Sequence, residues 1–253
     1  MIVLFTDFGL AGPYVGQVKA VLAERAAIHT IVDLQHDAPA CDPRAAAYLL
    51  APLIEHFPPA SVFLCVVDPG VGGERSSGVL RTADQWFVGA DNGLFEMVIR
   101  RALARGEDVR WWDITWCPRK LSASFHGRDI FASIAAQLAN GQGPESEIGE
   151  GFEERQISSI SRGKWPDDLY QVIYIDGFGN AMTGIRAARL DGKPMITVNG
   201  HNLSCAKTFS GVTEGAKFWY ENSCGLVEIS VNKGRASDIL GFKIGTVVSV
   251  ERL

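Results

Sequence analysis

The chain has 253 residues, of which 24 are Lys or Arg and 29 are Asp or Glu, so its formal net charge is -5. Its hydrophobic content of 47% and charged content of 21% are those of a globular protein and exclude global disorder. The acidic balance argues against a broad nucleic-acid-binding surface, which needs a basic face. No stretch approaches the roughly 20 apolar residues of a membrane helix. We therefore expect neither a nucleic acid nor a membrane as partner.

The beginning of the chain and the cysteines indicate the compartment. The apolar segment Met1–Phe5 is too short for a signal peptide, lacks a basic lead and meets Asp7 almost at once, so it predicts a buried strand. The cysteines are odd in number, lie far apart and never form a C-x-x-C pair: Cys41, Cys65, Cys117, Cys205 and Cys224. This usage predicts a reduced, cytoplasmic protein without a disulfide framework.

Residues 1–160 alternate strand-like and helix-like segments. Apolar runs predict strands at Ile2–Thr6, Thr30–Leu34 and Ser61–Val67, and a further strand pair at Gly78–Arg81 and Trp86–Gly89. Helical spacing predicts helices at Pro13–Arg25, Arg44–Phe57, Asn92–Leu103 and Arg128–Leu138. Asp42 followed by Pro43 is the expected cap and start of the second of these helices. Strands that alternate with helices imply an α/β domain whose mostly parallel sheet is covered on both faces.

The composition changes at Ser158–Asp168, a polar segment rich in helix and strand breakers that we interpret as a linker. Beyond it the helical periodicity disappears. Short strand-like segments separated by Gly, Asn and Asp turns follow at Leu169–Ile175, Met195–Val198, Gly225–Val231 and Gly245–Val250. The sequence therefore predicts two domains, an α/β domain at residues 1–160 and a smaller all-β barrel or sandwich at residues 169–253.

Three segments of the first domain carry residues with chemical potential, since α/β sheets bind ligands at the carboxyl ends of their strands. Asp7, directly after the first strand, repels phosphate and suits ribose hydroxyls or a cation, but a turn-capping role fits it equally well. The glycine-rich segment Asp68–Ser76 lets Asp68 and Arg75 pair across a loop, as a plain structural ion pair also would. His126, at a predicted helix start, is a candidate proton carrier, although a lone histidine is more often structural.

The second domain has two further candidate segments. Asp176–Asn180 ends a strand with an acid, an aromatic ring and an amide, which together can hold an ammonium group, stack on a base and read its edge; a β-turn built on Asp and Gly is the alternative. Asn222–Gly225 is either a binding segment or only a hairpin loop. The histidines lack metal-ligand spacing, so we expect no metal site. We assign the tryptophans at 111, 112 and 116 to the core or to an interface.

Six segments, taken in order, carry a resemblance to a known family: Thr6–Gly9, Asp68–Gly72, Ala90–Leu94, Phe125–Asp129, Asp176–Asn180 and Asn222–Asn232. The chain resembles the S-adenosyl-L-methionine hydrolase (adenosine-forming) family, also called SAM hydroxide adenosyltransferases, which are related to fluorinase and chlorinase. The resemblance extends from Ile2 to the last strand. It implies an α/β amino domain, a β-barrel carboxyl domain, and a homotrimer whose active sites lie between the amino domain of one subunit and the carboxyl domain of its neighbour.

The resemblance also implies which residues act. The catalytic Asp, Arg and His of the family fall on Asp68, Arg75 and His126, and the ribose-binding acid with its neighbour falls on Asp7 and Phe8. The other implied substrate-binding positions lie in the second domain: Asp176 with Ser223 nearby for methionine, Phe178 and Asn180 for the base, the backbone near Val231 for adenine, Asn222, and Glu228, for which a solvated strand glutamate is an equal alternative.

The implied reaction is hydrolysis of S-adenosyl-L-methionine (SAM) to adenosine and L-methionine by attack of activated water at the ribose C5′ carbon. A sulfonium leaves as a neutral thioether, so the reaction needs no general acid. Positioning contributes about 7–11 kcal/mol, and a general base adds roughly 10²–10⁴-fold in rate. Asp68 and His126 both remain candidates for that base. No cofactor is expected, since SAM is the substrate.

Two other functions compete with hydrolysis. The halogenating relatives carry arginine where this chain has Cys224, lack the Asp–His pairing, and contain a long extra loop that this chain does not show. Water is therefore favoured over a halide ion as the nucleophile. A non-catalytic adenosine- or SAM-binding sensor is the other alternative, and the intact set of Asp68, Arg75 and His126 argues against it.

Overall fold

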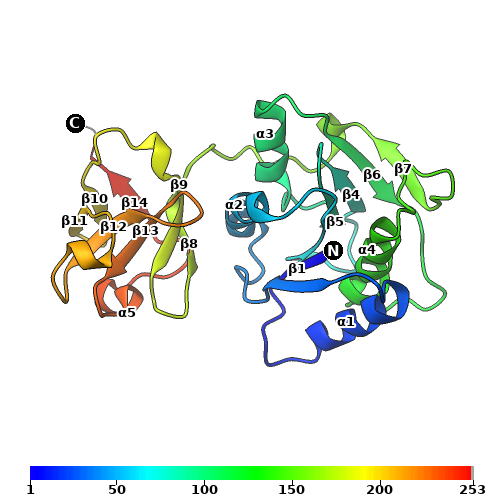
Figure 1. Ribbon diagram of the computed structural model, residues 1–253, viewed down its shortest axis with the longest axis horizontal. Coiled ribbons are helices and arrows are strands. Elements are labelled where there is room, and N and C mark those ends of the chain that lie inside the picture. Colours follow the sequence, from blue (N-terminus) through cyan, green and yellow to red (C-terminus); the bar gives the residue numbers. More distant parts are fainter. Residues whose placement is uncertain (252–253) are drawn as a thin grey trace. The chain divides into compact units, whose positions relative to one another are not determined.

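A computed structural model describes residues 1–251 and divides the chain into two compact units, Met1–Gly163 (unit 1) and Lys164–Leu253 (unit 2) (Figure 1). Unit 1 is a mixed α/β unit, and the described part of unit 2 is a nearly closed β-barrel. The predicted fold class is confirmed. Within residues 1–251, no helix is both long and apolar enough to cross a membrane.

Unit 1 contains a seven-stranded sheet in the order β2-β1-β3-β5-β4-β6-β7. Its strands are β1 (Ile2–Thr6), β2 (Ile31–Gln35), β3 (Val62–Val66), β4 (Ser77–Arg81), β5 (Trp86–Ala90), β6 (Arg110–Ile114) and β7 (Phe152–Arg155). The pairs β1–β2, β1–β3 and β3–β5 are parallel, whereas β4, β6 and β7 add antiparallel pairs. Every residue of β1 and β3 is buried, as expected for central strands that are covered on both faces.

The helices of unit 1 cover both faces of this sheet. They are α1 (Tyr14–Arg25), α2 (Pro43–Leu53), α3 (Glu96–Ala104) and α4 (Ala132–Ala139), with short turns η1 (Ile54–His56), η2 (Gly127–Phe131) and η3 (Ile157–Ser159). Helices α1 and α4 pack together, and so do α2 and α3 (Figure 1). Asp42 caps α2 as predicted, because its carboxylate accepts a hydrogen bond of 3.0 Å from the Ala45 amide. The predicted helix Arg44–Phe57 is shorter than expected, since α2 ends at Leu53.

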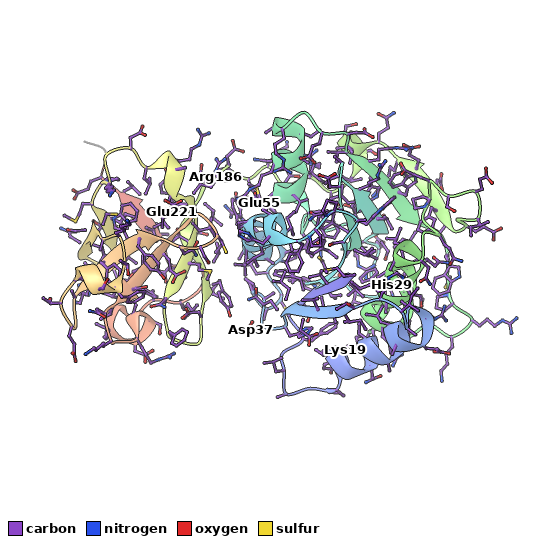
Figure 2. The ribbon with its side chains drawn as sticks, viewed as in Figure 1. Lys19, His29, Asp37, Glu55, Arg186 and Glu221 are labelled. Atoms are coloured by element: carbon purple, nitrogen blue, oxygen red, sulfur yellow. The ribbon has the colours of Figure 1, made fainter. Side chains whose placement is uncertain are left out.

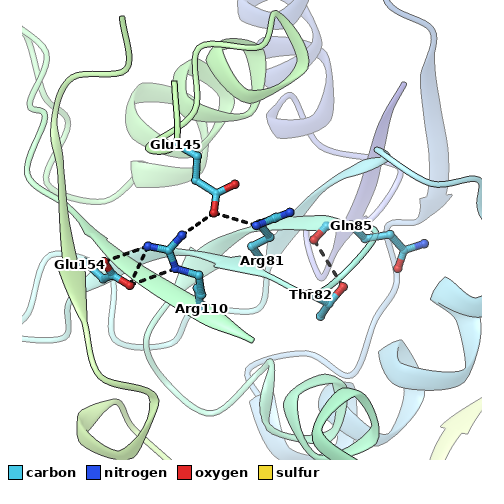
Figure 3. A network of polar contacts seen from close by, with 6 residues as sticks. All are labelled: Arg81, Thr82, Gln85, Arg110, Glu145 and Glu154. Atoms are coloured by element: carbon cyan, nitrogen blue, oxygen red, sulfur yellow. Dashed lines mark hydrogen bonds and ion pairs between the residues drawn. The ribbon is translucent and has the colours of Figure 1, made fainter. Parts of the chain in front are cut away.

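The antiparallel edge of the sheet is tied together by a charged network, which Figure 3 shows. Glu145, which follows α4, accepts hydrogen bonds from Arg81 of β4 at 2.7 Å and from Arg110 of β6 at 2.6 Å. Arg110 also pairs with Glu154 of β7 at 2.9 Å. These side chains are partly exposed, so each pair contributes at most about 1 kcal/mol. The network holds the edge strand in register without forming a buried charge.

The first part of the expected linker belongs to unit 1. The buried carboxylate of Asp91 accepts a hydrogen bond of 2.7 Å from the Ser161 amide, and Arg162 pairs with the buried Glu96 of α3. Arg100 also donates to the Gly163 carbonyl at 2.8 Å. Residues after Ser158 are therefore fixed to unit 1 until Gly163.

The described part of unit 2 contains a seven-stranded sheet in the order β14-β10-β11-β12-β13-β9-β8. Its strands are β8 (Leu169–Ile175), β9 (Ala181–Arg186), β10 (Ile196–Val198), β11 (His201–Cys205), β12 (Lys217–Glu221), β13 (Leu226–Val231) and β14 (Val248–Val250). Backbone hydrogen bonds from Val172 to Thr246 and from Gly245 to Val172 nearly close the barrel. Short helical elements are η4 (Ala187–Arg189), η5 (Phe209–Gly211) and α5 (Ala236–Leu240), of which the sequence analysis anticipated none.

Candidate functional site

In unit 1, Asp68, Arg75 and His126 form one hydrogen-bonded cluster. Asp68 follows β3, and the glycine-rich loop turns the chain back so that Arg75, just before β4, reaches it. The Arg75 Nε donates to both carboxylate oxygens of Asp68, at 3.0 and 3.1 Å, and its Nη2 also pairs with Asp68. The same Nη2 lies 3.0 Å from Nδ1 of His126. The structure thus brings together three side chains that are 7 and 51 positions apart in the sequence.

The Arg75 guanidinium is held by several neighbouring side chains. Its Nη1 donates to Ser77 Oγ at 3.0 Å, and its carbon lies 5.8 Å from the centre of the Phe131 ring. The Asp68 side chain is only 4% exposed and the Arg75 side chain 12%. A buried carboxylate is stable only when it is paired and hydrogen-bonded. Arg75 therefore holds the negative charge of Asp68 in place.

Burial and the contact with Arg75 together favour the neutral form of His126. A guanidinium only donates hydrogen bonds, so Nδ1 of His126 must accept, and the neutral ring carries its proton on Nε2. Partial burial, together with the neighbouring positive charge of Arg75, lowers the pKa of His126 below its ordinary value of 6.5, although Asp68 and Asp129 oppose this. The cluster therefore presents a neutral imidazole N–H beside a carboxylate at neutral pH.

Asp7 lies beside this cluster, because β1 and β3 are parallel neighbours and both carboxylates follow their carboxyl ends. Burial raises the pKa of Asp7, and the charge of Asp68 raises it further, while a hydrogen bond of 2.9 Å from the Cys41 amide lowers it. Phe8 packs against Tyr14 and Phe125, with ring centres 5.8 and 5.6 Å away. An aromatic wall thus adjoins the charged groups.

Two glycines allow close approaches that shape this part of unit 1. Gly72 has φ +78, and a Cβ placed there would lie 2.3 Å from the Ala123 carbonyl oxygen. A Cβ on Gly127 would lie 3.1 Å from Phe8 Cζ. Glycine at these positions lets the Asp68 loop and the start of η2, which directly follows His126, pack against their neighbours.

In unit 2, Asp176 organises the turn between β8 and β9. Its Oδ1 accepts from the amides of Phe178 and Asn180, at 2.9 and 2.8 Å, and its Oδ2 accepts from the Asn180 side chain at 3.1 Å. The turn built on Asp and Gly is therefore present, and it leaves the Phe178 ring 78% exposed. An exposed aromatic ring next to an anchored amide is suited to stacking on a flat ligand.

This turn forms part of a cavity of about 760 Å³, within the roughly 300–1,000 Å³ of small-molecule sites. The predicted residues that line it are Asp176, Phe178, Asn180, Glu228 and Val231, and the residues that the sequence analysis missed are Gly177, Phe209, Tyr220, Lys233, Gly234 and Arg235.

Glu228 is buried at the wall of this cavity, so the solvated alternative for it is wrong. The Tyr220 hydroxyl donates to one of its oxygens, and Asn222 donates to the other at 2.8 Å. Burial raises the pKa of Glu228 against these two hydrogen bonds, and Asp176 adds to the rise. The hairpin β12–β13 places Tyr220 directly opposite Glu228.

Asn222 and Ser223 lie in the hairpin between β12 and β13. Asn222 is buried and serves Glu228 and the hairpin turn, where its side-chain oxygen accepts from the Cys224 and Leu226 amides at 2.9 and 3.0 Å. Ser223 is exposed at the tip of the hairpin and is absent from the lining of the cavity as far as residues 1–251 define it. The hairpin-loop interpretation of Asn222–Gly225 thus describes the structure.

Among the described residues, no group of three or more His, Cys, Asp or Glu is arranged to hold a metal ion.

These features define a two-domain protein in which an α/β unit carries an Asp–Arg–His cluster and a β-barrel unit carries a ligand-sized cavity. The family models for the SAM hydroxide adenosyltransferase N-terminal and C-terminal domains match residues 2–149 and 170–249. The chain therefore belongs to the SAM hydroxide adenosyltransferase family.

Individual relatives agree with this placement. The chain is 40% identical to the (R)-S-adenosyl-L-methionine hydrolase of Thermus thermophilus, with 96% of each chain covered. The crystal structure of an uncharacterized conserved protein from Thermotoga maritima matches with a TM-score of 0.84 and 33% identity, over 100% of both chains. A more distant relative is the fluorinase of Nocardia brasiliensis, 25% identical with 99% of this chain and 96% of the relative covered.

Proposed function

We propose that this protein hydrolyses S-adenosyl-L-methionine to adenosine and L-methionine. Family membership and the name of the Thermus relative support the substrate and the reaction. The single observation that carries the proposal is the hydrogen-bonded cluster of Asp68, Arg75 and His126 beside Asp7. It supplies a proton acceptor, a fixed positive charge and a neutral N–H donor near the carboxyl ends of the central strands, and activation of a water molecule requires these groups.

The reaction balances without any further reactant. A water oxygen forms a bond to C5′, the bond between C5′ and the sulfonium sulfur breaks, and its electron pair remains on sulfur as a neutral thioether. One proton is released from the water to a base and then to solvent. The protein must therefore hold the water in line with the breaking bond and accept its proton.

We assign proton acceptance to Asp68 and hydrogen-bond donation to His126. The proton on Nε2 of the neutral His126 ring makes that atom a donor to the water oxygen, while its acceptor atom Nδ1 is already used by Arg75. A carboxylate has about four acceptor sites, and the contacts from Arg75 leave capacity on Asp68. Arg75 then compensates the negative charge that develops on the attacking oxygen.

We further assign substrate binding to both units. Asp7 accepts hydrogen bonds from the ribose hydroxyls, and Phe8 belongs to the wall next to it. Phe178 stacks on the adenine, which the Asn180 amide and the Val231 backbone recognise at its edge. Asp176 and Glu228 provide negative charge for the methionine ammonium. Asn222 acts by holding Glu228, and Ser223 contributes from the hairpin tip.

Product analysis in ¹⁸O-water tests the proposal. The wild-type protein is incubated with each sulfonium epimer of SAM, because the relative's name specifies the (R) epimer. The products are separated by chromatography, and their masses are determined by mass spectrometry. We expect adenosine labelled at the 5′ oxygen and unlabelled methionine, and no such products with Asp68→Asn. A 5′-halo-nucleoside as the main product in high chloride or fluoride, S-adenosylhomocysteine in place of methionine, or binding without turnover refutes hydrolysis.

We also propose a cytoplasmic homotrimer whose sites combine residues from two subunits. The support is the resemblance stated above, together with the placement of the catalytic cluster on unit 1 and the ligand cavity on unit 2. Co-expression of the inactive variants Asp68→Asn and Glu228→Gln tests it. If subunits share sites, random mixing restores activity at about a quarter of them, and light scattering gives three times the chain mass. A monomer, or no regained activity in the mixture, contradicts the arrangement.

A further inference from the structure

Two segments that follow neighbouring strands of unit 1 are joined side by side. Residues 6–9 end β1, and residues 36–41 follow β2, its parallel neighbour. The Ala38 amide donates to the Thr6 carbonyl at 3.1 Å, and the Gly9 amide donates to the His36 carbonyl at 2.6 Å. The Cys41 amide then donates to Oδ2 of Asp7 at 2.9 Å. These three hydrogen bonds join residues 6–9 to residues 36–41, and the Asp7 carboxylate is one of the groups that they hold.

The buried side chain of His36 links these two segments through its ring nitrogens. Its side chain is 2% exposed; Nδ1 lies 2.8 Å from Thr6 Oγ1, and Nε2 lies 3.0 Å from Asp33 Oδ1. Because a carboxylate only accepts, Nε2 carries the proton, and in the neutral ring Nδ1 accepts from the Thr6 hydroxyl. Asp33 is held in turn by Lys19 of α1 at 2.7 Å (Figure 2 labels Lys19).

These residue types also make up nucleophilic triads, but that reading does not fit here. Thr6 is only 1% exposed and its Oγ1 faces the buried ring of His36. No substrate atom reaches a hydroxyl in that position, and the hydroxyl also accepts a bond from the Phe8 amide at 3.4 Å. A positioning role accounts for every one of these contacts.

Cys41 transmits the position of this segment to Asp7 through its backbone. Its φ of +55 lies in the left-handed region, which is uncommon for a residue other than glycine. The next residue, Asp42, caps α2, and Pro43 starts that helix, so the helix end fixes the direction of the Cys41 N–H. The Cys41 side chain itself is exposed and takes no part.

We propose that His36 and the Cys41 backbone are positioning elements that hold the Asp7 carboxylate for the ribose of its ligand. This inference rests on the proposed function, which assigns the ribose hydroxyls to Asp7. The ring of His36 locks the two segments together, and the Cys41 N–H sets the orientation of the carboxylate. The same N–H counteracts the rise in the pKa of Asp7 that burial and Asp68 cause, so it also favours the ionised form of the acceptor.

The test measures adenosine binding by calorimetry and SAM hydrolysis by chromatography on the full-length protein. His36→Leu removes both ring hydrogen bonds, whereas His36→Asn keeps an acceptor near the position of Nδ1. We expect His36→Leu to raise the adenosine Kd and the KM roughly tenfold, as for a lost bond to a charged group, while kcat changes less than about twofold. His36→Asn should recover part of the loss. His29→Asn is the matched control, because His29 lies before β2 and its ring nitrogen Nε2 lies 3.0 Å from Asn140 Oδ1, away from Asp7 in the sequence (Figure 2 labels His29).

A second pair of variants at an exposed position decides the question if His36→Leu does not fold. Cys41→Pro removes the N–H donor and cannot adopt the positive φ, while Cys41→Gly keeps the donor and adopts that φ freely. We expect the proline variant to bind adenosine roughly tenfold more weakly and the glycine variant to recover most of that affinity. Equal affinity in both variants, or a fall in kcat with unchanged KM, overturns the positioning role but leaves the proposed function standing. A wild type that neither binds adenosine nor hydrolyses SAM overturns the proposed function and this inference with it.

Discussion

Replacing Arg75 separates the structural and chemical roles of the catalytic cluster. Arg75→Ala removes the partner of Asp68, whose side chain is 4% exposed, and leaves an unpaired carboxylate. Removing one partner of a buried ion pair costs about 3–5 kcal/mol. We therefore expect a loss of about 3 kcal/mol or more in the free energy of unfolding. Activity should fall by roughly 10²-fold or more, the scale of a lost acid–base group.

The double variant Arg75→Ala/Asp68→Ala sharpens this test. It removes the unpaired charge as well as its partner, so it should recover most of the lost unfolding free energy, whereas activity should stay as low as in the single variant. Urea unfolding followed by circular dichroism gives the first quantity, and adenosine formation gives the second. Arg81→Ala is the control, since its partly exposed pair with Glu145 contributes at most about 1 kcal/mol. A double variant that is no more stable than Arg75→Ala, or an active Arg75→Ala, refutes the reasoning.

Three other expectations follow from the same structure. Because the pKa of His126 is lowered, the fall of kcat/KM on acidification should have its midpoint below pH 6.5, and a pH–rate profile with its midpoint at or above pH 6.5 contradicts this. Because the pKa of Glu228 is raised, the folded state holds its proton more tightly than the unfolded state does, so its contribution to stability is complete below pH 4.5 and is lost as pH rises through the raised pKa. Unfolding of Glu228→Gln at several pH values should show no such loss. Gly72→Ala should cost about 1–3 kcal/mol and lower activity, since the φ is positive and the new Cβ meets the Ala123 oxygen at 2.3 Å, whereas Gly73→Ala, with 3.2 Å to its nearest neighbour, should cost less in thermal unfolding.

The fold was predictable where apolar runs are uninterrupted. The buried strands β1 and β3 and the capped helix α2 follow from local sequence, because each is defined by a run of apolar residues or by an Asp–Pro start. Strands β6 and β7 were missed. In β6 two adjacent tryptophans hide the alternation of a strand, and β7 carries charged residues at the edge of the sheet. Edge strands owe their conformation to their neighbour more than to their own sequence.

The candidate site was predictable to a smaller extent, since its members come from distant parts of the chain. The sequence names Asp68 and Arg75 as possible partners because they flank one loop, and the structure pairs them. It offers no local signal for His36, whose meaning depends on the adjacency of β1 and β2. Tyr220 was within reach: counting back from the hairpin loop at Asn222–Gly225 places it opposite Glu228.

The surroundings of the cluster also suit the charge change in the proposed reaction. Attack of a hydroxide-like oxygen on a sulfonium brings opposite charges together and ends with two neutral products, so an environment that is poor in water favours the transition state over the separated charges. Phe8, Tyr14 and Phe125 form an aromatic wall next to Asp7 and His126, with Tyr14 and Phe125 ring centres 5.3 Å apart. The charged groups of the cluster and Asp7 are held by other protein groups: Arg75 by Asp68, and Asp7 by the Cys41 amide. Such fixed groups need little reorganisation when the charge moves, which is how a site made of only a few side chains can stabilise the transition state.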